Sequence, residues 1–439
     1  MRIYVKLLLM SILIFTGCSK QEGCTDIIAC NYNNDAEIDD GTCEYPEINY
    51  NCANECISDS DNDGLCDEDD NTSGCTDENA CNYNSTFTLN EDLTSCIYPD
   101  GYCDECSGET DGTGVILDND DDDDGLCNED EYLIFSLCEG NFQADNSSLW
   151  YFDNNYNVLE PENNPIGDTG QSMLVDNNKL YVVMNGSGLI HVFNLNPNGI
   201  QLDRTINLDF SGPRYMEIYN GNAFITEWNT NQIRVFDLDN DQTISTIEVN
   251  GMPEQIFMHE NYFYISINMN SDWTASERLL KLNPDTYEIE MEYTTAPNPS
   301  DLVVIENKLF VSSTYYDTNW NTYHAMTKID LSNGETIIYN DESGINYSGD
   351  IFNIEGSLYR ATNYGVINLD LNTLSAIPGT EIGNFDDVYS VEFMDSQFYF
   401  GRTDYAAPDY IDVLDTNGSL IKSMVVGAIP GSFAIWNKN

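Results

Sequence analysis

A short apolar strand pattern returns seven times in the later part of the chain, and this repeat restricts the fold more than any other feature. Successive copies start 40 to 49 residues apart. The copies are Leu133–Ser136, Leu180–Val183, Ala223–Thr226, Phe263–Ser266, Leu309–Ser312, Leu358–Ala361 and Phe398–Gly401. Turn residues separate them from further alternating segments, without a sustained helical period. Four strands per unit at this period are typical of β-propeller blades.

The two ends of the repeat region predict how such a ring closes. Pro430–Trp436 matches an innermost strand without the rest of its blade. The segment that begins at Tyr132, including Ser148–Asp153, supplies three further strands. A blade shared between the ends fastens the ring and removes its sheet edges. We therefore predict an all-β chain with a seven-bladed β-propeller over residues 132–439; a β-sandwich, the rival fold, predicts no period.

The first residues have the pattern of an export signal. Two basic residues precede an apolar run, Leu7–Phe15, that is too short to span a bilayer as a helix. The run ends in Phe15-Thr16-Gly17-Cys18, which resembles the bacterial lipobox except for Phe at its first position. We expect residues 1–17 to be a signal peptide, Cys18 to be lipidated, and residues 18–22 to be a linker. A plain signal peptide cleaved nearby is the alternative. No later segment is apolar for long enough to cross a membrane, so the lipid is the expected anchor.

The charge of the chain is extreme and uneven. It holds 76 Asp and Glu residues against 15 Lys and Arg residues, a formal net charge of -61. Residues 19–131 carry 34 of the acidic residues and one basic residue, Lys20. A surface this negative repels phosphate backbones, which argues against nucleic-acid binding. Carboxylates at this density resist compaction unless cations neutralise them, so a divalent metal is expected.

Residues 23–131 contain a duplicated cysteine-rich module, with copies at 23–73 and 74–131. The clearest matches are Gly23–Asp26 with Gly74–Asp77 and Ala29–Asn33 with Ala80–Asn84. Each copy has six cysteines, which in an exported protein predicts three disulfides. The candidates are Cys24, Cys30, Cys43, Cys52, Cys56, Cys66, Cys75, Cys81, Cys96, Cys103, Cys106 and Cys127. We align Cys52, Cys56 and Cys66 with Cys103, Cys106 and Cys127. Six cysteines allow 15 pairings, so connectivity stays open, and zinc is the competing interpretation.

Each copy closes on a ladder of oxygen ligands. The residues fall at positions 1, 3, 5, 9 and 12 of an EF-hand-like loop, with glycine at position 6, where the chain turns sharply. They are Asp59, Asp61, Asp63, Asp67 and Asp70 in the first copy, and Asp120, Asp122, Asp124, Asn128 and Glu131 in the second. This spacing predicts calcium as a cofactor; a solvated acidic linker is the alternative.

The ladders resemble thrombospondin type 3 calcium repeats. The Gly-Cys-Thr-Asp and Ala-Cys-Asn-Tyr-Asn units resemble modules of surface proteins in marine Bacteroidota. The resemblance covers residues 23–131 and implies a rigid stalk loaded with calcium, which calcium removal is expected to loosen.

One cysteine remains after these assignments. Cys138 lies in the blade segment Tyr132–Phe142 and is expected to be a buried free thiol that packs as a small apolar group. A catalytic role would need a neighbouring base, and the only histidines are His191, His259 and His324.

Several segments of the repeat region resemble YncE-like (YVTN-type) propeller lipoproteins of Bacteroidota. The matching stretches are Cys138–Leu149, Gly167–Met173, Gly212–Tyr215 and Gly251–Gln255. Some members of that group are surface lipoproteins that capture corrinoids and pass them to a TonB-dependent vitamin B12 transporter. The resemblance implies an outer-membrane lipoprotein at the cell surface with a corrinoid-like ligand and such a transporter as partner. Blade motifs specify a fold better than a ligand.

In a propeller, the turns into the innermost strands and the loops between second and third strands meet on one face. The turns bring the candidate ligand-binding residues Gln171, Arg214, Tyr215, Glu254, Gln255, Asp301, Asp350 and Tyr389. The loops bring Trp228, Trp273, Tyr315, Trp320, Tyr364, Arg402 and Tyr405. Aromatic faces beside amides and charges suit a large planar molecule or a sugar chain.

Two other classes of function remain open. A propeller lyase or hydrolase could use a buried carboxyl such as Asp350, although the three histidines share no position in the repeat and no nucleophile motif stands out. An adhesive or glycan-binding surface protein fits the predicted calcium stalk as well as a capture protein does.

Overall fold

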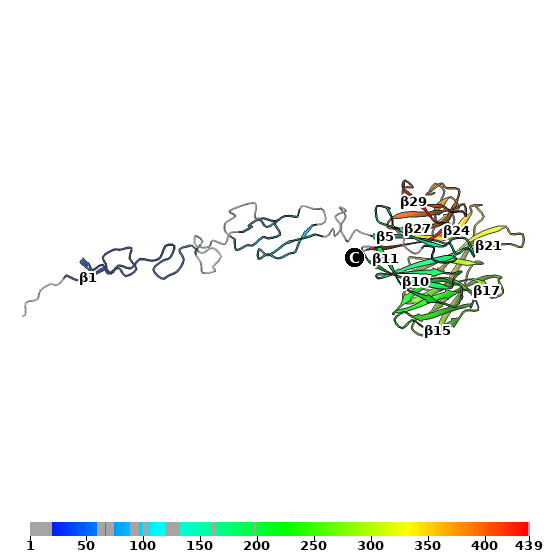
Figure 1. Cartoon of the computed structure of the whole chain (residues 1–439), viewed down its shortest axis with the longest axis horizontal. Helices are drawn as coiled ribbons and strands as arrows, with labels where there is room; N and C mark the ends of the chain where they lie inside the picture. The colour runs from blue at the N-terminus through cyan, green and yellow to red at the C-terminus, as the bar shows by residue number, and fades with distance from the viewer. Residues whose placement is uncertain are drawn as a thin grey trace, which may run out of the picture. The chain divides into compact units, whose positions relative to one another are not determined.

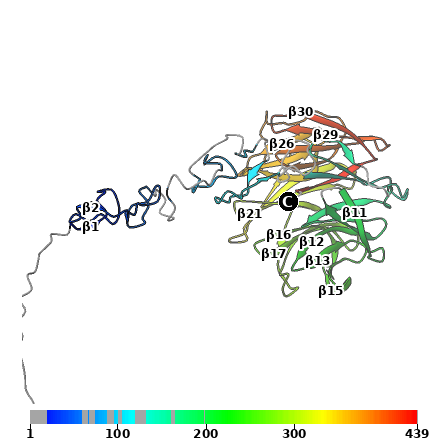
Figure 2. The same ribbon diagram turned by 60° about the vertical axis from the view of Figure 1, so that its left-hand side comes forward.

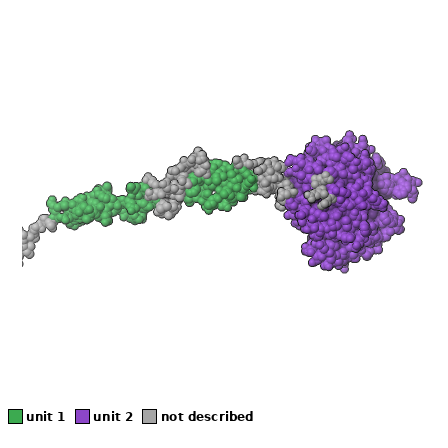
Figure 3. Space-filling view, viewed as in Figure 1, with its two compact units in different colours: residues 1–127 green, residues 128–439 purple. Residues whose placement is uncertain are grey.

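The computed structural model describes residues 20–58, 66, 74–87, 96–99, 104–118, 132–159, 164–196 and 199–437. The chain divides into two compact units, unit 1 with residues 1–127 and unit 2 with residues 128–439 (Figure 3). Every regular element in the described ranges is a β-strand. Within those ranges there is no helix of the length and apolarity that a bilayer crossing requires.

Unit 2 consists of seven antiparallel sheets, one for each predicted blade. Blade 1 holds β31 (Pro430–Asn437), β5 (Tyr132–Cys138), β6 (Ser148–Phe152) and β7 (Val158–Leu159). Blade 2 holds β8 (Gly170–Asp176), β9 (Lys179–Met184), β10 (Leu189–Asn196) and β11 (Gly199–Asn207). Blade 3 holds β12 (Pro213–Tyr219), β13 (Asn222–Glu227), β14 (Gln232–Asp237) and β15 (Gln242–Glu248). Blade 4 holds β16 (Gly251–His259), β17 (Tyr262–Asn270), β18 (Ala275–Leu282) and β19 (Ile289–Thr294).

The remaining blades complete the ring. Blade 5 holds β20 (Pro299–Ile305), β21 (Lys308–Tyr316), β22 (Thr322–Asp330) and β23 (Thr336–Asn340). Blade 6 holds β24 (Tyr347–Ile354), β25 (Ser357–Thr362) and β26 (Gly365–Leu369). Blade 7 holds β27 (Val388–Met394), β28 (Gln397–Arg402), β29 (Asp409–Asp415) and β30 (Leu420–Val426). The innermost strands β8, β12, β16, β20, β24, β27 and β31 contact one another in that order, and β31 also contacts β8. Figures 1 and 2 show the propeller in two views. The predicted seven-bladed propeller is confirmed.

The predicted closure by a shared blade is also confirmed. The last strand of the ring, β31, pairs antiparallel with β5 from the other end of the propeller sequence, from Asn437 opposite Tyr132 to Pro430 opposite Cys138. The recurring motif is the second strand of every blade.

Cys138 is a buried free cysteine in β5, and burial raises the pKa of its thiol to about 12.

Apolar clusters fill the interfaces between neighbouring blades. Between blades 3 and 4, for example, Phe224 of β13 packs on Phe263 of β17 with ring centroids 4.7 Å apart. Because each middle strand lies between two neighbouring sheets, both of its faces are buried, which explains the nearly continuous apolar runs of the repeat motif.

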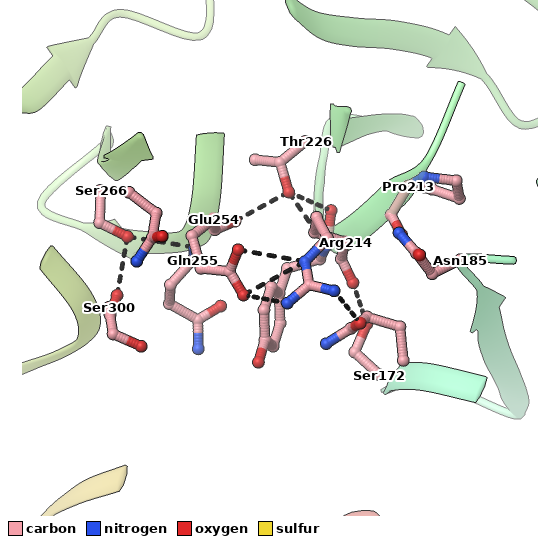
Figure 4. A network of polar contacts seen from close by, with 12 residues as sticks. Ser172, Asn185, Pro213, Arg214, Thr226, Glu254, Gln255, Ser266 and Ser300 are labelled. Carbon is pink, nitrogen blue, oxygen red and sulfur yellow. Dashed lines mark hydrogen bonds and ion pairs between the residues drawn. The ribbon is translucent and has the colours of Figure 1, made fainter. Parts of the chain in front are cut away.

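Hydroxyl groups on the second strands of blades 3, 4 and 5 each bond to the next blade. Thr226 Oγ1 donates to the carbonyl of Glu254 at 2.8 Å, and Ser266 Oγ donates to the carbonyl of Ser300 at 2.7 Å (Figure 4). Ser312 Oγ makes the equivalent bond to the carbonyl of Gly349 at 2.5 Å. In these three blades the Ser or Thr at the last motif position satisfies a carbonyl of the following innermost strand.

Blade 6, whose residues are all described, departs from the expected four strands. The segment after β26 makes only isolated bridges, Val366 with Ile382 and Leu369 with Ala376. Pro378 has no N–H for a ladder, and Gly379 has a φ of 84°. These two residues replace the expected fourth strand with an irregular segment.

Unit 1 has little regular structure. Strand β1 (Glu22–Gly23) pairs parallel with β2 (Ile38–Asp39), and β3 (Glu105–Cys106) pairs antiparallel with β4 (Ile116–Leu117). In both copies a tyrosine hydroxyl donates to the aspartate of the opening motif: Tyr45 to Asp26 at 2.8 Å and Tyr98 to Asp77 at 2.7 Å. The duplicated sequence therefore makes a duplicated local structure.

Five disulfides join the described cysteines of unit 1, in agreement with the prediction of a disulfide-rich segment. They are Cys24–Cys43, Cys30–Cys52, Cys56–Cys66, Cys75–Cys96 and Cys81–Cys106. The alignment of Cys52 with Cys103 is wrong, because the partner of Cys81 is Cys106. The loop that this bond closes is longer in the second copy than in the first, with 25 residues against 22, so matching cysteines by order misplaced the pair. Cys103 and Cys127 lie outside the described residues.

Candidate functional site

The strand registers bring two sets of loops to the same end of the propeller. Pro213, at the start of β12, lies opposite Glu227, at the end of β13, and Gly251 lies opposite Asn270 in the same way. The turn into each innermost strand therefore lies beside the loop between the second and third strands of its blade. We call this end the entrance rim; its loops are 139–147, 185–188, 228–231, 271–274, 317–321, 363–364 and 403–408.

A cavity of about 240 Å³ lies below the entrance rim, lined by residues from all seven innermost strands. Every innermost strand has an irregular register near its start, for example between Pro213 and Met216. Such bulges redirect side chains. Here they leave polar residues around the axis. Six predicted residues line the cavity: Gln171, Tyr215, Glu254, Gln255, Asp301 and Asp350.

Arg214 and Glu254 form an ion pair beside this cavity. The Arg214 Nε lies 3.1 and 3.2 Å from the two carboxylate oxygens of Glu254, and Nη2 lies 2.5 Å from Oε1 (Figure 4). Arg214 Nη1 also donates to Gln171 Oε1. The guanidinium lies 4.3 Å from the centre of the Trp228 ring. Trp228 was predicted as an open ligand-binding face, but one side of its indole is already covered by Arg214.

Carboxylates lie on neighbouring innermost strands beyond this pair. Asp301 Oδ2 accepts from the N–H of Ile351 in the next blade at 2.9 Å, and Asp350 Oδ2 accepts from that of Val391 at 3.2 Å. Burial, with the charge of Asp301, raises the pKa of Asp350 to about 7. These side chains both connect blades and give the cavity its acidic wall.

The sequence prediction missed Glu392, which also lines the cavity. Burial and the charges of Asp301 and Asp350 raise its pKa to about 8. It is the fifth residue of β27, beyond the turn that the prediction considered. The charged residue that lies between Val391 and Phe393 in strand Val388–Met394 was the signal that could have revealed it.

Tyr389 was predicted to face the site but does not line the cavity. Its hydroxyl donates to Glu139 Oε1 at 2.9 Å, and its ring meets the ring of Tyr405 edge to face at 6.3 Å. Burial raises the pKa of Glu139. Tyr389 therefore supports the rim below Tyr405 and does not contribute to the cavity wall.

Exposed aromatic side chains of the propeller gather at the entrance rim. The most exposed is Trp320, at 81%, followed by Phe142, Phe210, Trp273, Tyr405, Tyr316, Tyr364, Tyr410 and Tyr323. In the described part of unit 2, the large exposed apolar residues away from this end are all aliphatic, such as Ile244 and Met291 on outer strands. Tyr315, which was also predicted, is half-buried and stacks on Tyr323 at 5.6 Å. The β21–β22 hairpin that carries Trp320 projects at the right of Figure 1.

Four of these aromatic residues have a backbone conformation that bulky side chains rarely adopt. The φ angles are 66° at Trp273, 63° at Trp320, 68° at Tyr405 and 56° at Phe210. The first two occupy the same turn position, since the N–H of Trp273 bonds to the Asn270 carbonyl and that of Trp320 to the Asp317 carbonyl. Asn or Gly would suit this position better. A tryptophan held there at the surface is a signal of function.

Arg402 is occupied by structural contacts. It bonds to Asp387 and Asp412, each at 2.6 Å, and lies 4.6 Å from the centre of the Phe385 ring. It lines a separate groove of about 520 Å³ between blades 6 and 7. The predicted site therefore separates into an axial cavity, an aromatic rim and Arg402, which belongs to neither.

Two histidines are held in structural contacts away from the cavity. His324 Nε2 accepts from the N–H of Tyr347 at 3.3 Å, and its Nδ1 lies 3.0 Å from Thr314 Oγ1. Burial, together with the charge of Arg360, lowers the pKa of His324 to about 4, so the ring is neutral. His191 bonds Thr205 Oγ1 and the Ile166 carbonyl.

Among the residues that the structure describes, no group of three or more His, Cys, Asp or Glu side chains is arranged to hold a metal ion. All ten predicted calcium ligands lie outside these residues, as does the predicted lipidation site Cys18.

No protein-family model matches the chain, and no curated protein matches it. Solved structures match it in fold. A 6-phosphogluconolactonase-like protein from Bacteroides uniformis aligns over 70% of this chain and 100% of its own, with 11% identity and a TM-score of 0.53. A similar protein from Bacteroides fragilis aligns over 71% and 100%, with 13% identity and a TM-score of 0.52. A functionally unknown protein from Desulfotomaculum acetoxidans aligns over 70% and 99%, with 10% identity and a TM-score of 0.50. Such identities show a shared propeller fold alone.

Proposed function

We propose that the propeller is a ligand-capture domain that binds its ligand at the entrance rim. The observation that carries this proposal is the gathering of exposed aromatic residues at one end of the ring, with Trp273 and Trp320 in the same strained turn position. Aromatic side chains supply large rigid contact areas at low entropic cost, which is why they dominate binding surfaces. A stable fold alone does not require tryptophan at these two tips.

The proposed ligand is a corrinoid-like molecule, on the strength of the sequence resemblance. Pockets that enclose drug-sized molecules have volumes of about 300–1,000 Å³, so the axial cavity of about 240 Å³ is too small for a corrinoid. A ligand of that size would lie across the rim. In this proposal the chain is an outer-membrane lipoprotein exposed at the cell surface. It is held by a lipid on Cys18, has calcium bound in its acidic loops, and acts beside a TonB-dependent transporter.

Glycan binding, with a role in adhesion, is the second candidate. It is favoured by the stacked Tyr315–Tyr323 pair near Trp320 on the projecting hairpin, because flat aromatic faces suit the apolar faces of sugar rings. An enzyme of the lyase or hydrolase type is a weaker candidate, since the raised pKa values of Asp350 and Glu392 are its only support.

The test is titration of the calcium-loaded protein, residues 19–439, with cobalamin, its biosynthetic relatives and a panel of glycans. The combined substitution Trp273→Ala and Trp320→Ala is expected to weaken binding at least about 30-fold, since buried interface aromatics commonly contribute 2 kcal/mol or more. Ile244→Ala, at an exposed aliphatic residue of β15, is the matched control. Unchanged affinity in the double variant would contradict the assignment to the rim. Binding of glycans alone would favour the second candidate.

A further inference from the structure

The wall of the axial cavity holds more acidic groups than basic groups. Its lining includes the carboxyl groups of Glu254, Asp301, Asp350 and Glu392. The nearest described cation, Arg214, already forms the ion pair with Glu254. Arg360 stands behind the wall, where it donates to the carbonyls of Ala325 and Ser313 and does not line the cavity. Three carboxyl groups therefore face one small space without an adjacent partner cation.

Tyr215 provides an independent observation at the same place. It is half-buried, packs against the apolar cluster between blades 3 and 4, and lines the cavity. Its backbone N–H bonds to Thr226 Oγ1, whereas the phenol hydroxyl forms no hydrogen bond to any part of the chain that is described. The phenol oxygen is therefore open to the cavity, where it can accept a hydrogen bond from a bound group.

We propose that the axial cavity binds a primary ammonium group. A ligand that binds at the rim would then carry a short alkylammonium arm that reaches into the cavity. The inference rests on the proposed function, because the cavity lies directly below the entrance rim. An ammonium group has three N–H donors on a compact charge, which matches carboxylates and a phenol oxygen around one point. The aromatic residues at the rim favour the approach of a cation.

A metal ion fits the cavity less well. Direct coordination requires several oxygen ligands at about 2.0–2.6 Å from one point, and the described carboxylates of the cavity are not grouped in this way. Hydrogen bonds to an ammonium group tolerate the wider spacing. A cavity of about 240 Å³ also leaves room for a short carbon chain behind the charge.

Proton release is a consequence that can be measured. In the empty cavity, burial raises the pKa of Asp350 to about 7 and that of Glu392 to about 8, so both are partly protonated at neutral pH. A bound cation favours the ionised carboxylates. Asp301, Glu254 and Tyr215 also face the space, while Arg214 is paired with Glu254 and Arg360 lies behind the wall. Binding should therefore release protons, and affinity should rise from pH 6 to pH 9 while the amine stays charged.

The experiment is calorimetric titration of the full ectodomain with 1,4-diaminobutane, with 1,4-butanediol as the neutral ligand of matched shape. At pH 8 we expect saturable binding of the diamine with proton release, detected by repeating the titration in buffers of different ionisation enthalpy, and no binding of the diol. The double substitution Asp350→Asn and Glu392→Gln should weaken diamine binding at least about tenfold. Tyr215→Phe should weaken it less. Glu288→Gln, at an exposed carboxylate in the turn before β19, should leave it unchanged.

Each outcome decides the proposal. Equal binding of the diol, equal binding by the double variant, or no diamine binding between pH 6 and pH 9 would overturn it. Thermal melts of the variants establish that a loss of binding does not reflect unfolding. Trp273→Ala with Trp320→Ala tests the rim separately. If a ligand binds at the rim but the diamine does not bind, the ammonium site alone is refuted. If the diamine binds equally well to the rim variant and no ligand of the rim is found, the proposed capture function alone is refuted.

Discussion

In the described part of unit 1, the buried apolar residues are cysteines and alanines, such as Cys24 and Ala80, while Ile27 and Ile48 are exposed at 77% and 85%. In the propeller, every blade interface holds a cluster of Leu, Ile, Val or Phe, and the one cysteine, Cys138, is not cross-linked. The two units thus obtain stability from different sources, covalent cross-links in one and apolar burial in the other.

The carboxylates of the two units differ in the same way. In unit 1 they bond to nearby turn groups: the Thr113 hydroxyl and N–H both donate to Asp111, and these bonds lower its pKa. In the axial cavity, burial raises the pKa of Asp350 and Glu392. Aspartate and glutamate side chains thus stabilise exposed turns in unit 1 and line an enclosed cavity in the propeller. Whether the carboxyl group is exposed or buried decides the direction of its pKa shift.

Reduction should separate the two units most clearly. A native disulfide in a small exported domain contributes about 2–5 kcal/mol, so unit 1 should unfold when its five described disulfides are reduced, while the propeller stays folded. All five tryptophans lie after residue 131, so tryptophan fluorescence reports the propeller alone. Hydrogen exchange of peptides from residues 20–58 reports unit 1. Simultaneous loss of both signals would show that the units are not independent.

Phe224→Ala should destabilise the propeller and leave unit 1 unchanged. The ring is fully buried between blades 3 and 4, and its removal should destabilise the propeller by about 3–5 kcal/mol. Denaturant unfolding followed by tryptophan fluorescence measures the loss. Ile244→Ala in the same blade should stay within about 0.5 kcal/mol of wild type. Hydrogen exchange in unit 1 should not change; a change there would contradict the comparison.

Calcium removal should act on residues 23–131 and not on the blades. If the ladders at residues 59–70 and 120–131 bind calcium, a chelator should speed proteolysis within residues 23–131 and leave the propeller fragment intact. Peptide mapping over a time course measures both. The control is the chain with Asp61→Asn and Asp122→Asn, which should be cleaved quickly with or without chelator. Protease resistance that does not respond to chelator would refute the calcium prediction.

The last expected effect is on the pH dependence of the propeller. Because the pKa of Glu392 is raised to about 8 in the fold, against about 4.3 in an unfolded chain, the folded state binds this proton more tightly. Its contribution to stability therefore falls as the pH rises from about 4 to about 8. Glu392→Gln should reduce the decline of the melting temperature between pH 5 and pH 8. Parallel curves for variant and wild type would contradict it.

The blade repeat and its closure could be predicted because burial between sheets leaves a period in the sequence. The motif Phe263–Ser266, for instance, lies in the second strand of its blade, where both faces of the strand are buried. The absence of a fourth strand in blade 6 was harder to predict, because it depends on Pro378 and Gly379 inside a segment of the expected length.

The candidate site could be predicted in part. Turn positions located Asp301 and Asp350 correctly at the cavity, but register irregularities near the start of each innermost strand decide which side chains face the axis. Hydrophobic patterns do not encode those irregularities. They also do not show that Trp228 is covered by Arg214, because that contact joins neighbouring loops. The alignment of Cys52 with Cys103 failed for a similar reason, since the two copies close this loop with different numbers of residues.

The shared blade has a consequence for biosynthesis. Of the propeller strands, β31 is synthesised last, and it is the innermost strand of the blade that β5 begins. Until β31 has been synthesised, β5 has a free edge and the ring stays open between β27 and β8. The final contact joins segments about 300 residues apart, the kind of long-range pairing that forms slowly. A nascent or truncated chain that lacks this strand would therefore have six complete blades and one blade with an unpaired strand edge. Such an edge is a target for chaperones and proteases.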